Sequence, residues 1–140
     1  MSVLLDTNVL SELAQPLPAK TVIQYCRKTK AAYLSVITIH ELLYGAKLVK
    51  AKTKQKKLLT WIDLIRVQYE HCILDITFEI VGRSADLRAI AGGKGCVLHI
   101  EDALIAATAL EHSLDLATRN TRDFKTTGVT LIDPWKGKTK

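Results

Sequence analysis

Four acidic residues stand where predicted strands give way to helices or turns. Asp6 follows the apolar run at 3–5, and Glu41 lies in the first turns of a helix after a second strand. Asp102 lies in the first turn of a nearly apolar helix, and Asp123 follows a fourth strand. Ligands of open α/β sheets bind outside the carboxyl ends of the strands. If the strands are parallel, we expect these four carboxylates to converge at one edge of the sheet.

Such a cluster has a definite chemistry. Carboxylates that are packed together repel each other, so either some of them keep their protons or a cation neutralises them. Carboxylate oxygens without His or Cys partners favour hard ions such as Mg2+ or Mn2+. An ion of that kind activates water and stabilises charge on a phosphate. The pattern therefore favours metal-assisted hydrolysis of a phosphate ester, as in a nuclease.

Each acid also has a purely structural interpretation, which the sequence leaves open. Asp6 can cap a helix, with the polar residues after it as turn formers. Asp102 at a helix N-terminus interacts favourably with the helix dipole. Glu41 can be a solvated helix residue, and Asp123 can belong to a surface turn. The placement of all four acids at strand ends is what favours a common site over four separate roles.

The elements that must position these acids alternate between short apolar strands and helices. We expect strands at 3–5, 32–37, 72–76, 114–118 and 129–132, and helices at 20–28, 39–49, 77–91 and 101–112. A further helix is expected to begin within the lysine-rich segment at 47–57 and to continue to 69. Such alternation is typical of a mostly parallel sheet covered by helices on both faces. The sequence therefore predicts a single α/β domain over residues 1–140, built as a three-layer α/β/α sandwich with a central, mostly parallel sheet.

Proline and glycine mark where regular structure is expected to stop. Residues 15–18, which include two prolines, are predicted to form a loop before the helix at 20–28. The glycine cluster at 92–95 lacks the spacing of a phosphate-binding loop and is interpreted as a helix end and a flexible loop. Pro134 is expected to end regular structure, and residues 136–140 are expected to form a basic flexible tail.

The chain is basic, with a net charge of +6. A positive net charge favours association with polyanions such as nucleic acid, although it also serves solubility. Six lysines crowd one segment without sharing a helical face: Lys47, Lys50, Lys52, Lys54, Lys56 and Lys57. They are interpreted either as contacts to an RNA backbone or as a solvated connection between two helices.

Cysteine usage and hydropathy indicate the compartment. The three cysteines are widely spaced, which argues against a disulfide framework or a zinc site and for reduced, buried thiols. No signal-peptide pattern is visible, and the longest apolar stretch, at 103–110, is far shorter than the roughly 20 residues that span a bilayer. We therefore expect a soluble, cytoplasmic protein with no membrane partner.

Four segments together make the chain similar to the PIN-domain ribonucleases, specifically the VapC-type toxins of bacterial and archaeal toxin–antitoxin pairs. The segments are LLDTNVLSEL at 4–13, SVITIHELLYGA at 35–46, IEDALIAATALEHSLDLATRN at 100–120 and RDF at 122–124. They follow the family order from the first strand to past the fourth, so the resemblance covers essentially the whole chain. It implies a PIN-like fold and cleavage of RNA by metal-activated water, with Mg2+ or Mn2+ as the cofactor.

The resemblance also implies roles for individual residues. Asp6, Asp102 and Asp123 would hold one or two metal ions, and Glu41 would either ligate an ion or orient the attacking water. The polar residues that would line or brace the pocket are Asn8, Ser35, Thr118 and Asn120. Glu101 departs from the usual family pattern, because relatives often carry a proline just before this aspartate, and it adds an acid to the site.

The partners implied by the resemblance are an RNA substrate, a second copy of the chain and a small antitoxin protein. Transfer RNA is favoured over ribosomal RNA as the substrate. Antitoxins of the family commonly cover the catalytic pocket with their tail, so the same is expected here.

Two other functions stay open on the residues alone. A non-catalytic, basic RNA- or DNA-binding module would bind nucleic acid in a salt-sensitive way, without metal and without cleavage. An aspartate-nucleophile phosphatase would use Asp6, but such enzymes carry a second aspartate where Asn8 stands. A phosphoryl group trapped on Asp6 would identify the phosphatase, and the absence of Mn2+ binding would favour the module.

Overall fold

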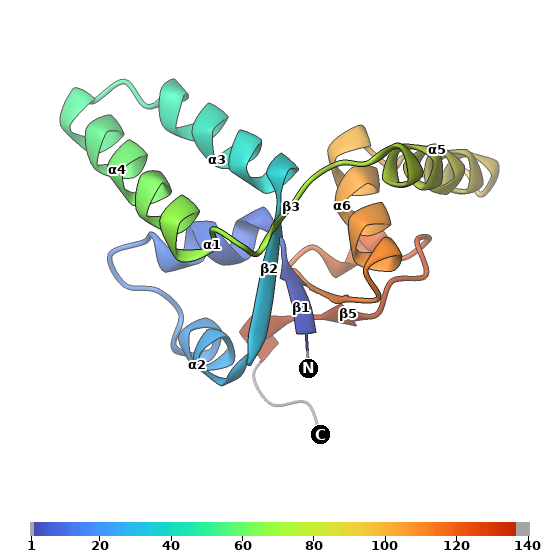
Figure 1. Ribbon diagram of the computed structural model, residues 1–140, viewed down its shortest axis with the longest axis horizontal. Coiled ribbons are helices and arrows are strands. Elements are labelled where there is room, and N and C mark those ends of the chain that lie inside the picture. Colours follow the sequence, from blue (N-terminus) through green and yellow to red (C-terminus); the bar gives the residue numbers. More distant parts are fainter. Residues whose placement is uncertain (1, 137–140) are drawn as a thin grey trace.

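Five short parallel strands form the centre of the molecule. The computed structural model describes residues 2–136 of the chain. The strands are β1 (Ser2–Leu5), β2 (Ala31–Ser35), β3 (Ile73–Leu74), β4 (Asp115–Ala117) and β5 (Leu131–Ile132). They lie in the order β3-β2-β1-β4-β5, and every neighbouring pair is parallel (Figure 1). The strand order reverses at the central strand β1, and open α/β sheets bind their ligands at such a switch point, outside the carboxyl ends of the strands.

Helices make the connections between the strands. The α-helices of residues 2–136 are α1 (Thr7–Leu13), α2 (Lys20–Lys28), α3 (Val36–Leu48), α4 (Lys52–Gln68), α5 (Phe78–Gly93) and α6 (Ile100–Glu111). Two short 3-10 helices, η1 (Thr121–Phe124) and η2 (Pro134–Lys136), follow β4 and β5. The chain thus alternates strands and helices, as its hydrophobic pattern predicts.

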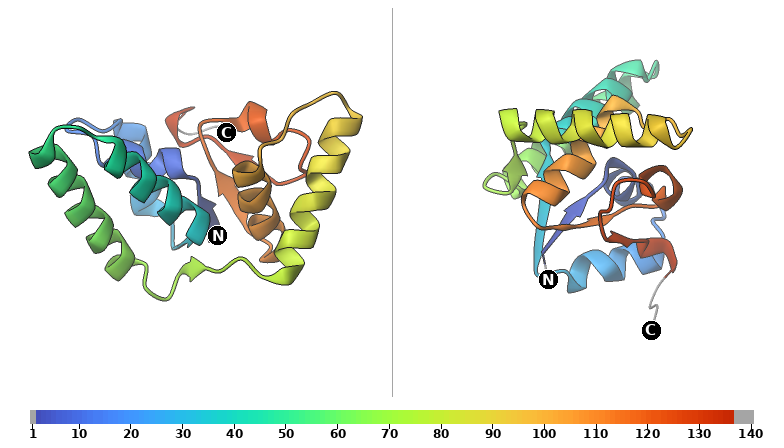
Figure 2. Two further views of the ribbon diagram at one scale, coloured as in Figure 1. Left: turned by 90° about the horizontal axis from the view of Figure 1, so that it is seen from above. Right: turned by 90° about the vertical axis from the view of Figure 1, so that its right-hand side faces the viewer.

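The side chains of β1 alternate between two hydrophobic cores, one on each face of the sheet. Val3 and Leu5 pack in a core with residues of α1 to α4, whereas Leu4 packs in a second core with α5 and α6. Successive side chains of a strand point to opposite faces, so a strand covered on both sides is apolar throughout. Figures 1 and 2 show the two helical layers on opposite sides of the sheet. The predicted three-layer α/β/α sandwich is confirmed.

Small side chains let α6 lie close to the sheet. Ala103, Ala106 and Ala107 have no exposed surface, and they share a core with Leu4 of the central strand. The distance between packed elements depends on the side chains at the contact, so alanines allow a close approach. The one buried polar group on this helix, the Thr108 hydroxyl, donates to the Leu104 carbonyl at 2.7 Å. This packing fixes the first turn of α6, which carries Asp102.

The helix α1 was not assigned from the sequence, in which only the capping interpretation of Asp6 indicates a helix at this position. Val9 and Leu10 are fully buried. Burial of these two side chains stabilises α1, whose polar residues by themselves give no clear helical pattern. The Glu12 carboxylate then accepts a hydrogen bond from the Ala19 amide at 2.7 Å, which fixes the connection to α2. The two prolines do lie in that connection.

Several predicted boundaries also need correction. The strand predicted at 32–37 ends at Ser35, because the Ser35 side chain caps α3. The helix predicted at 77–91 continues through two glycines to Gly93, and the turn is made by Gly95, which has a positive φ of 74°. Pro134 begins η2 rather than ending regular structure, since proline is well suited to the first position of a helix.

Two further sequence expectations concern the chain end and the membrane. Lys136, the first residue of the predicted tail at 136–140, belongs to η2, and 137–140 lie outside the described residues. Among residues 2–136, none of the helices is long and apolar enough to cross a membrane.

Replacing Ala106 with leucine should destabilise the protein, because the added volume has no space between α6 and the sheet. Overpacking of this kind costs about 1–3 kcal/mol, measured as a lower free energy of unfolding in urea. Ala89→Leu, at an exposed position of α5, is the matched control and should change that free energy by less than about 0.5 kcal/mol. Equal stability of the two variants would contradict close packing of α6.

Candidate active site

Asp6 lies at the junction of β1 and α1, and three donors hold its carboxylate. The Thr7 amide donates to Oδ1 at 2.8 Å, and Oδ2 accepts from the Thr118 hydroxyl at 2.7 Å and from the Asn8 amide nitrogen at 3.3 Å. Only 5% of the residue is exposed. The helix-cap and active-site interpretations of Asp6 are therefore compatible, because the residue that caps α1 also stands at the carboxyl edge of the sheet.

Glu41 reaches the same region from α3, where it is half-buried. The Thr7 hydroxyl donates to Glu41 Oε1, and it also lies 3.3 Å from the Thr38 hydroxyl. Thr7 thus connects two of the predicted acids, since its amide binds Asp6 and its hydroxyl binds Glu41. The sequence reasoning missed both threonines as site residues. Their positions, one residue after Asp6 and three before Glu41, were the available signal.

The other two acids come from the opposite side of β1. Asp102 is half-buried in the first turn of α6, and Asp123 is exposed in η1, after β4. The Asp123 amide donates to the Asn120 carbonyl at 3.0 Å, so the turn after β4 places this residue. The Asp123 interpretation as part of a surface turn is correct for its backbone and does not conflict with a role in a site.

The pKa values of three acids show that the cluster is electrostatically connected. Burial is the largest cause in each case, and it raises the pKa of Asp6, Glu41 and Asp102. The charges of the other three acids add to burial and bring the pKa of Asp102 to about 6. The charge of Asp123 also raises the pKa of Asp6, and Asp6 and Glu101 raise that of Glu41. The four predicted acids therefore lie near enough, at one edge of the sheet, for their charges to act on the pKa values of Asp6, Glu41 and Asp102.

Three of the predicted bracing residues form a network around Asp6. The Asn8 side chain donates to Asp6 and Thr118, both at 3.3 Å, and accepts from the Arg119 amide at 3.3 Å. The Asn120 amide donates to the fully buried Thr118 hydroxyl at 3.0 Å. These contacts tie the end of β4 to the start of α1 and hold the Asp6 carboxylate in one orientation.

Ser35 lies at the end of β2 and, in the described part of the chain, makes no hydrogen bond to the four acids. Its hydroxyl is buried and accepts from the Ile37 amide at 3.0 Å, so the side chain caps α3. Its contribution to the site is indirect, because α3 carries Glu41.

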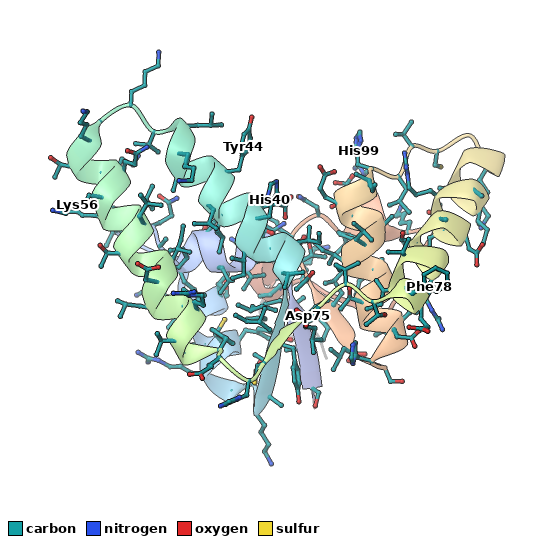
Figure 3. All side chains as sticks on the ribbon, turned by 45° about the horizontal axis from the view of Figure 1, so that its top comes forward. His40, Tyr44, Lys56, Asp75, Phe78 and His99 are labelled. Atoms are coloured by element: carbon teal, nitrogen blue, oxygen red, sulfur yellow. The ribbon has the colours of Figure 1, made fainter. Side chains whose placement is uncertain are left out.

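The six lysines lie along the arm formed by α3 and α4. Lys47 is near the end of α3, Lys50 is in the connection, and the other four are in α4. The Gln55 side chain donates to three carbonyls of the turn, those of Ala46, Lys47 and Val49. Lys56 projects from the outer side of α4, away from the start of α6 (Figure 3). The lysines are thus spread over several faces, as their spacing predicted.

The four acids lack a basic partner of their own. Within residues 2–136, none of them forms an ion pair with Lys, Arg or His. The donor set is therefore negatively charged and made of oxygen alone, which suits a hard divalent cation. In that same part of the chain, no three His, Cys, Asp or Glu side chains are grouped tightly enough to hold an ion. Asp6 is fixed by its hydrogen bonds, whereas Asp102 and Asp123 are more exposed. To bind an ion together with Asp6, the side chains of Asp102 and Asp123 would have to turn toward that ion.

A central parallel strand that ends at a buried aspartate, with further acids at the same edge of the sheet, is the arrangement of a PIN domain. Residues 3–129 match the PIN domain family, so the chain belongs to that family.

Two curated relatives match almost the whole chain. The VapC ribonuclease Y4jK of Sinorhizobium fredii is 31% identical over 137 residues, which cover 96% of this chain and 98% of that protein. Toxin FitB of Neisseria gonorrhoeae is 34% identical over 136 residues, which cover 95% of this chain and 98% of the toxin. Among solved structures, FitAcB from Neisseria gonorrhoeae has a TM-score of 0.89 at 34% identity, with 96% of this chain and 99% of that chain covered.

Neutralising Asp102 should stabilise the chelator-treated protein at neutral pH. The pKa of Asp102 is about 6 in the folded state and about 3.9 in an unfolded chain. The folded state therefore binds more protons between these values, and stability is lost as the pH rises through them. Because the carboxyl group is half-exposed, we expect Asp102→Asn to gain about 1 kcal/mol at pH 7.5 and almost nothing at pH 4.

Urea unfolding at the two pH values, with a chelator present, measures this difference. Asp86→Asn, at an exposed position of α5, is the control and should show no pH-dependent gain. A gain for Asp102→Asn that is equal at pH 4 and pH 7.5 would contradict the raised pKa.

Proposed function

We propose that this PIN-domain protein is a metal-dependent endoribonuclease and the toxin of a toxin–antitoxin pair. The observation that carries the proposal is the cluster of four acids around a buried, hydrogen-bonded Asp6, without a basic partner within residues 2–136. The names of the relatives support it, because one is a VapC ribonuclease and another is a toxin. The net charge of +6 supports a polyanionic substrate.

The ion of the site would be Mg2+ or Mn2+, held by Asp6, Asp102 and Asp123, with Glu41 as a further ligand. The chemistry of the donors supports this assignment, because carboxylate oxygens bind hard ions and the mutual repulsion of the acids calls for a cation. A bound ion of this kind activates water and stabilises charge on the scissile phosphate. The activated water would attack the phosphorus atom, and the bond from phosphorus to the 3′ oxygen of the RNA would break.

The residues of the chain would divide the remaining work. Asp6, fixed by Thr7 and Thr118, would be the rigid anchor of the site. Glu41, held by the Thr7 hydroxyl, would orient the attacking water or join the ligands. Asp123, the exposed member, would stand at the mouth of the site toward the RNA.

The partners that we propose are an RNA substrate, with transfer RNA favoured, a second copy of the chain and a small antitoxin that covers the active site. A solved structure of a relative supports an antitoxin, since it is a toxin-antitoxin complex from Klebsiella pneumoniae, at 30% identity and a TM-score of 0.69, with 94% of this chain and 97% of that chain covered.

Replacing Asp6 with asparagine should abolish RNA cleavage while the protein stays folded. Asparagine also caps helices and keeps an oxygen for the Thr7 amide, but it removes the charge that an ion requires. We expect a loss of about a hundredfold to a thousandfold in the rate of cleavage of total transfer RNA with Mg2+ or Mn2+ present, of the order seen when a group that stabilises charge is removed. Chelation should stop the wild-type reaction.

The control for this experiment is Asp63→Asn, which removes an exposed aspartate from α4 and should cleave like wild type. Circular dichroism checks the fold of all variants. Cleavage by Asp6→Asn at the wild-type rate would overturn the site. Salt-sensitive RNA binding without cleavage, and without an effect of metal, would identify a binding module instead.

Mn2+ should stabilise the wild-type protein against unfolding, because only the folded state brings the four acids together. A ligand at one hundred times its Kd stabilises the folded state by about 2.7 kcal/mol. A thermal-shift titration should therefore raise the Tm of wild type and of Asp63→Asn, but not that of Asp6→Asn. A titration in which Mn2+ raises the three Tm values equally would place the ion elsewhere.

A further inference from the structure

An exposed pair of aromatic rings stands on α3 beside the acids. His40 and Tyr44 are one helical turn apart, with ring centroids 6.4 Å apart and ring planes within 7° of parallel. Tyr44 is 60% exposed, and His40 is also exposed. An amphipathic helix normally turns its aromatic residues toward the core. Here both residues are exposed instead, and their rings are nearly parallel and stacked on the helix surface.

The pair adjoins the acidic site. His40 directly precedes Glu41, and its charge lowers the pKa of that acid against the larger, raising effect of burial. Figure 3 shows His40 and Tyr44 on α3 and His99, at the start of α6, on the same side of the molecule. The aromatic rings therefore lie at the rim of the site and not on a distant surface.

Lys47 extends the same helical surface. Residues at i, i+4 and i+7 share one face of a helix, and His40, Tyr44 and Lys47 have this spacing. Lys47 lies about 10 Å along the axis from His40, at 1.5 Å per residue. The exposed face of α3 thus carries two stacked rings followed by a cation, with the half-buried Glu41 of the site next to the first ring. Lys47 is the member of the six lysines that belongs to this face.

We propose that His40 and Tyr44 form a stacking platform for an unpaired base of the RNA substrate, next to the phosphate that is cleaved. Unpaired RNA bases stack on exposed aromatic rings, whereas paired bases are not available for such contacts. Lys47 then contacts the RNA backbone one step further from the site. This inference rests on the proposed ribonuclease function and deepens it, because it selects single-stranded segments such as loops over paired ones.

RNA binding by the full chain tests the platform. All variants carry Asp6→Asn so that the RNA stays intact, and fluorescence anisotropy measures the Kd of a labelled eight-nucleotide single-stranded RNA. Tyr44→Ala should weaken binding about fivefold or more, the effect of losing one base–aromatic stack. Tyr44→Phe keeps the ring and should bind within twofold of the parent. Phe78→Ala, which removes an 87% exposed ring from α5, is the matched control and should also stay within twofold.

RNAs with a single abasic position separate stacking from any other effect of the substitution. At one position, the abasic RNA should bind the parent and Tyr44→Ala equally, because the base that stacks is already missing. At the other positions, the difference between the two proteins should persist. His40→Ala, measured in the same way, should show a loss at that same position.

Three outcomes overturn the inference. The first is an unchanged Kd for Tyr44→Ala and His40→Ala, and the second is an equal loss for Tyr44→Phe and Tyr44→Ala. The third is a change in the mass of the assembly, measured by light scattering, at an unchanged Kd, which would assign the rings to a contact between protein chains. Cleavage by the chain with aspartate at position 6 is measured separately. Failure to cleave, together with the expected binding pattern, would overturn the nuclease and leave the base-stacking site in place.

Discussion

The site depends on one buried carboxylate. Asp6 is almost inaccessible to water, and burying an ionised carboxylate is costly unless donors replace its hydration. Those donors are supplied by the residue that follows it in α1 and by Thr118 at the end of β4. The parallel pairing of β1 with β4, in which Leu5 lies opposite Ala117, sets the distance between Asp6 and Thr118. A shift of that register would separate the carboxylate from its strongest donor and disturb the fold and the site together.

Burial of Asp6 has consequences for the other acids. Glu41 and Asp102 are brought toward it by α3 and α6, and each of these helices is held by a different hydrophobic core. Because α3 and α6 pack on opposite faces of the sheet, the repulsion among the acids opposes the packing of both helices. The pKa of Asp102, raised to about 6 by burial and then by the charges around it, is the measurable sign of that opposition. The repulsion among the acids lowers the free energy of unfolding. The close packing of the small side chains of α6 and the burial of the apolar strands offset this loss.

The sequence predicted the layers of the fold well because they depend on long hydrophobic patterns. The apolar runs at 3–5 and 103–110 can be buried in few other ways. It did not predict α1, since a seven-residue helix has little intrinsic signal and forms only because Val9 and Leu10 are buried by partners far away in the chain. The acids were found because charge at a strand end is conspicuous. Thr7 and Thr38 were missed because a threonine hydroxyl can be recognised as part of a site only when its neighbours in the folded structure are known.

The net charge of the whole chain and the local charge of the four acids would have opposite effects on the proposed RNA substrate. The chain as a whole is positive, so at distances comparable with the Debye length of about 10 Å it attracts a phosphate backbone. At contact, the four carboxylates would repel the phosphate that is to be cleaved. A divalent cation would change the sign of the local field. A base stacked on the rings of His40 and Tyr44 would add a contact that involves no phosphate, so the stacking would complement the ion and would not compete with it for the same phosphate.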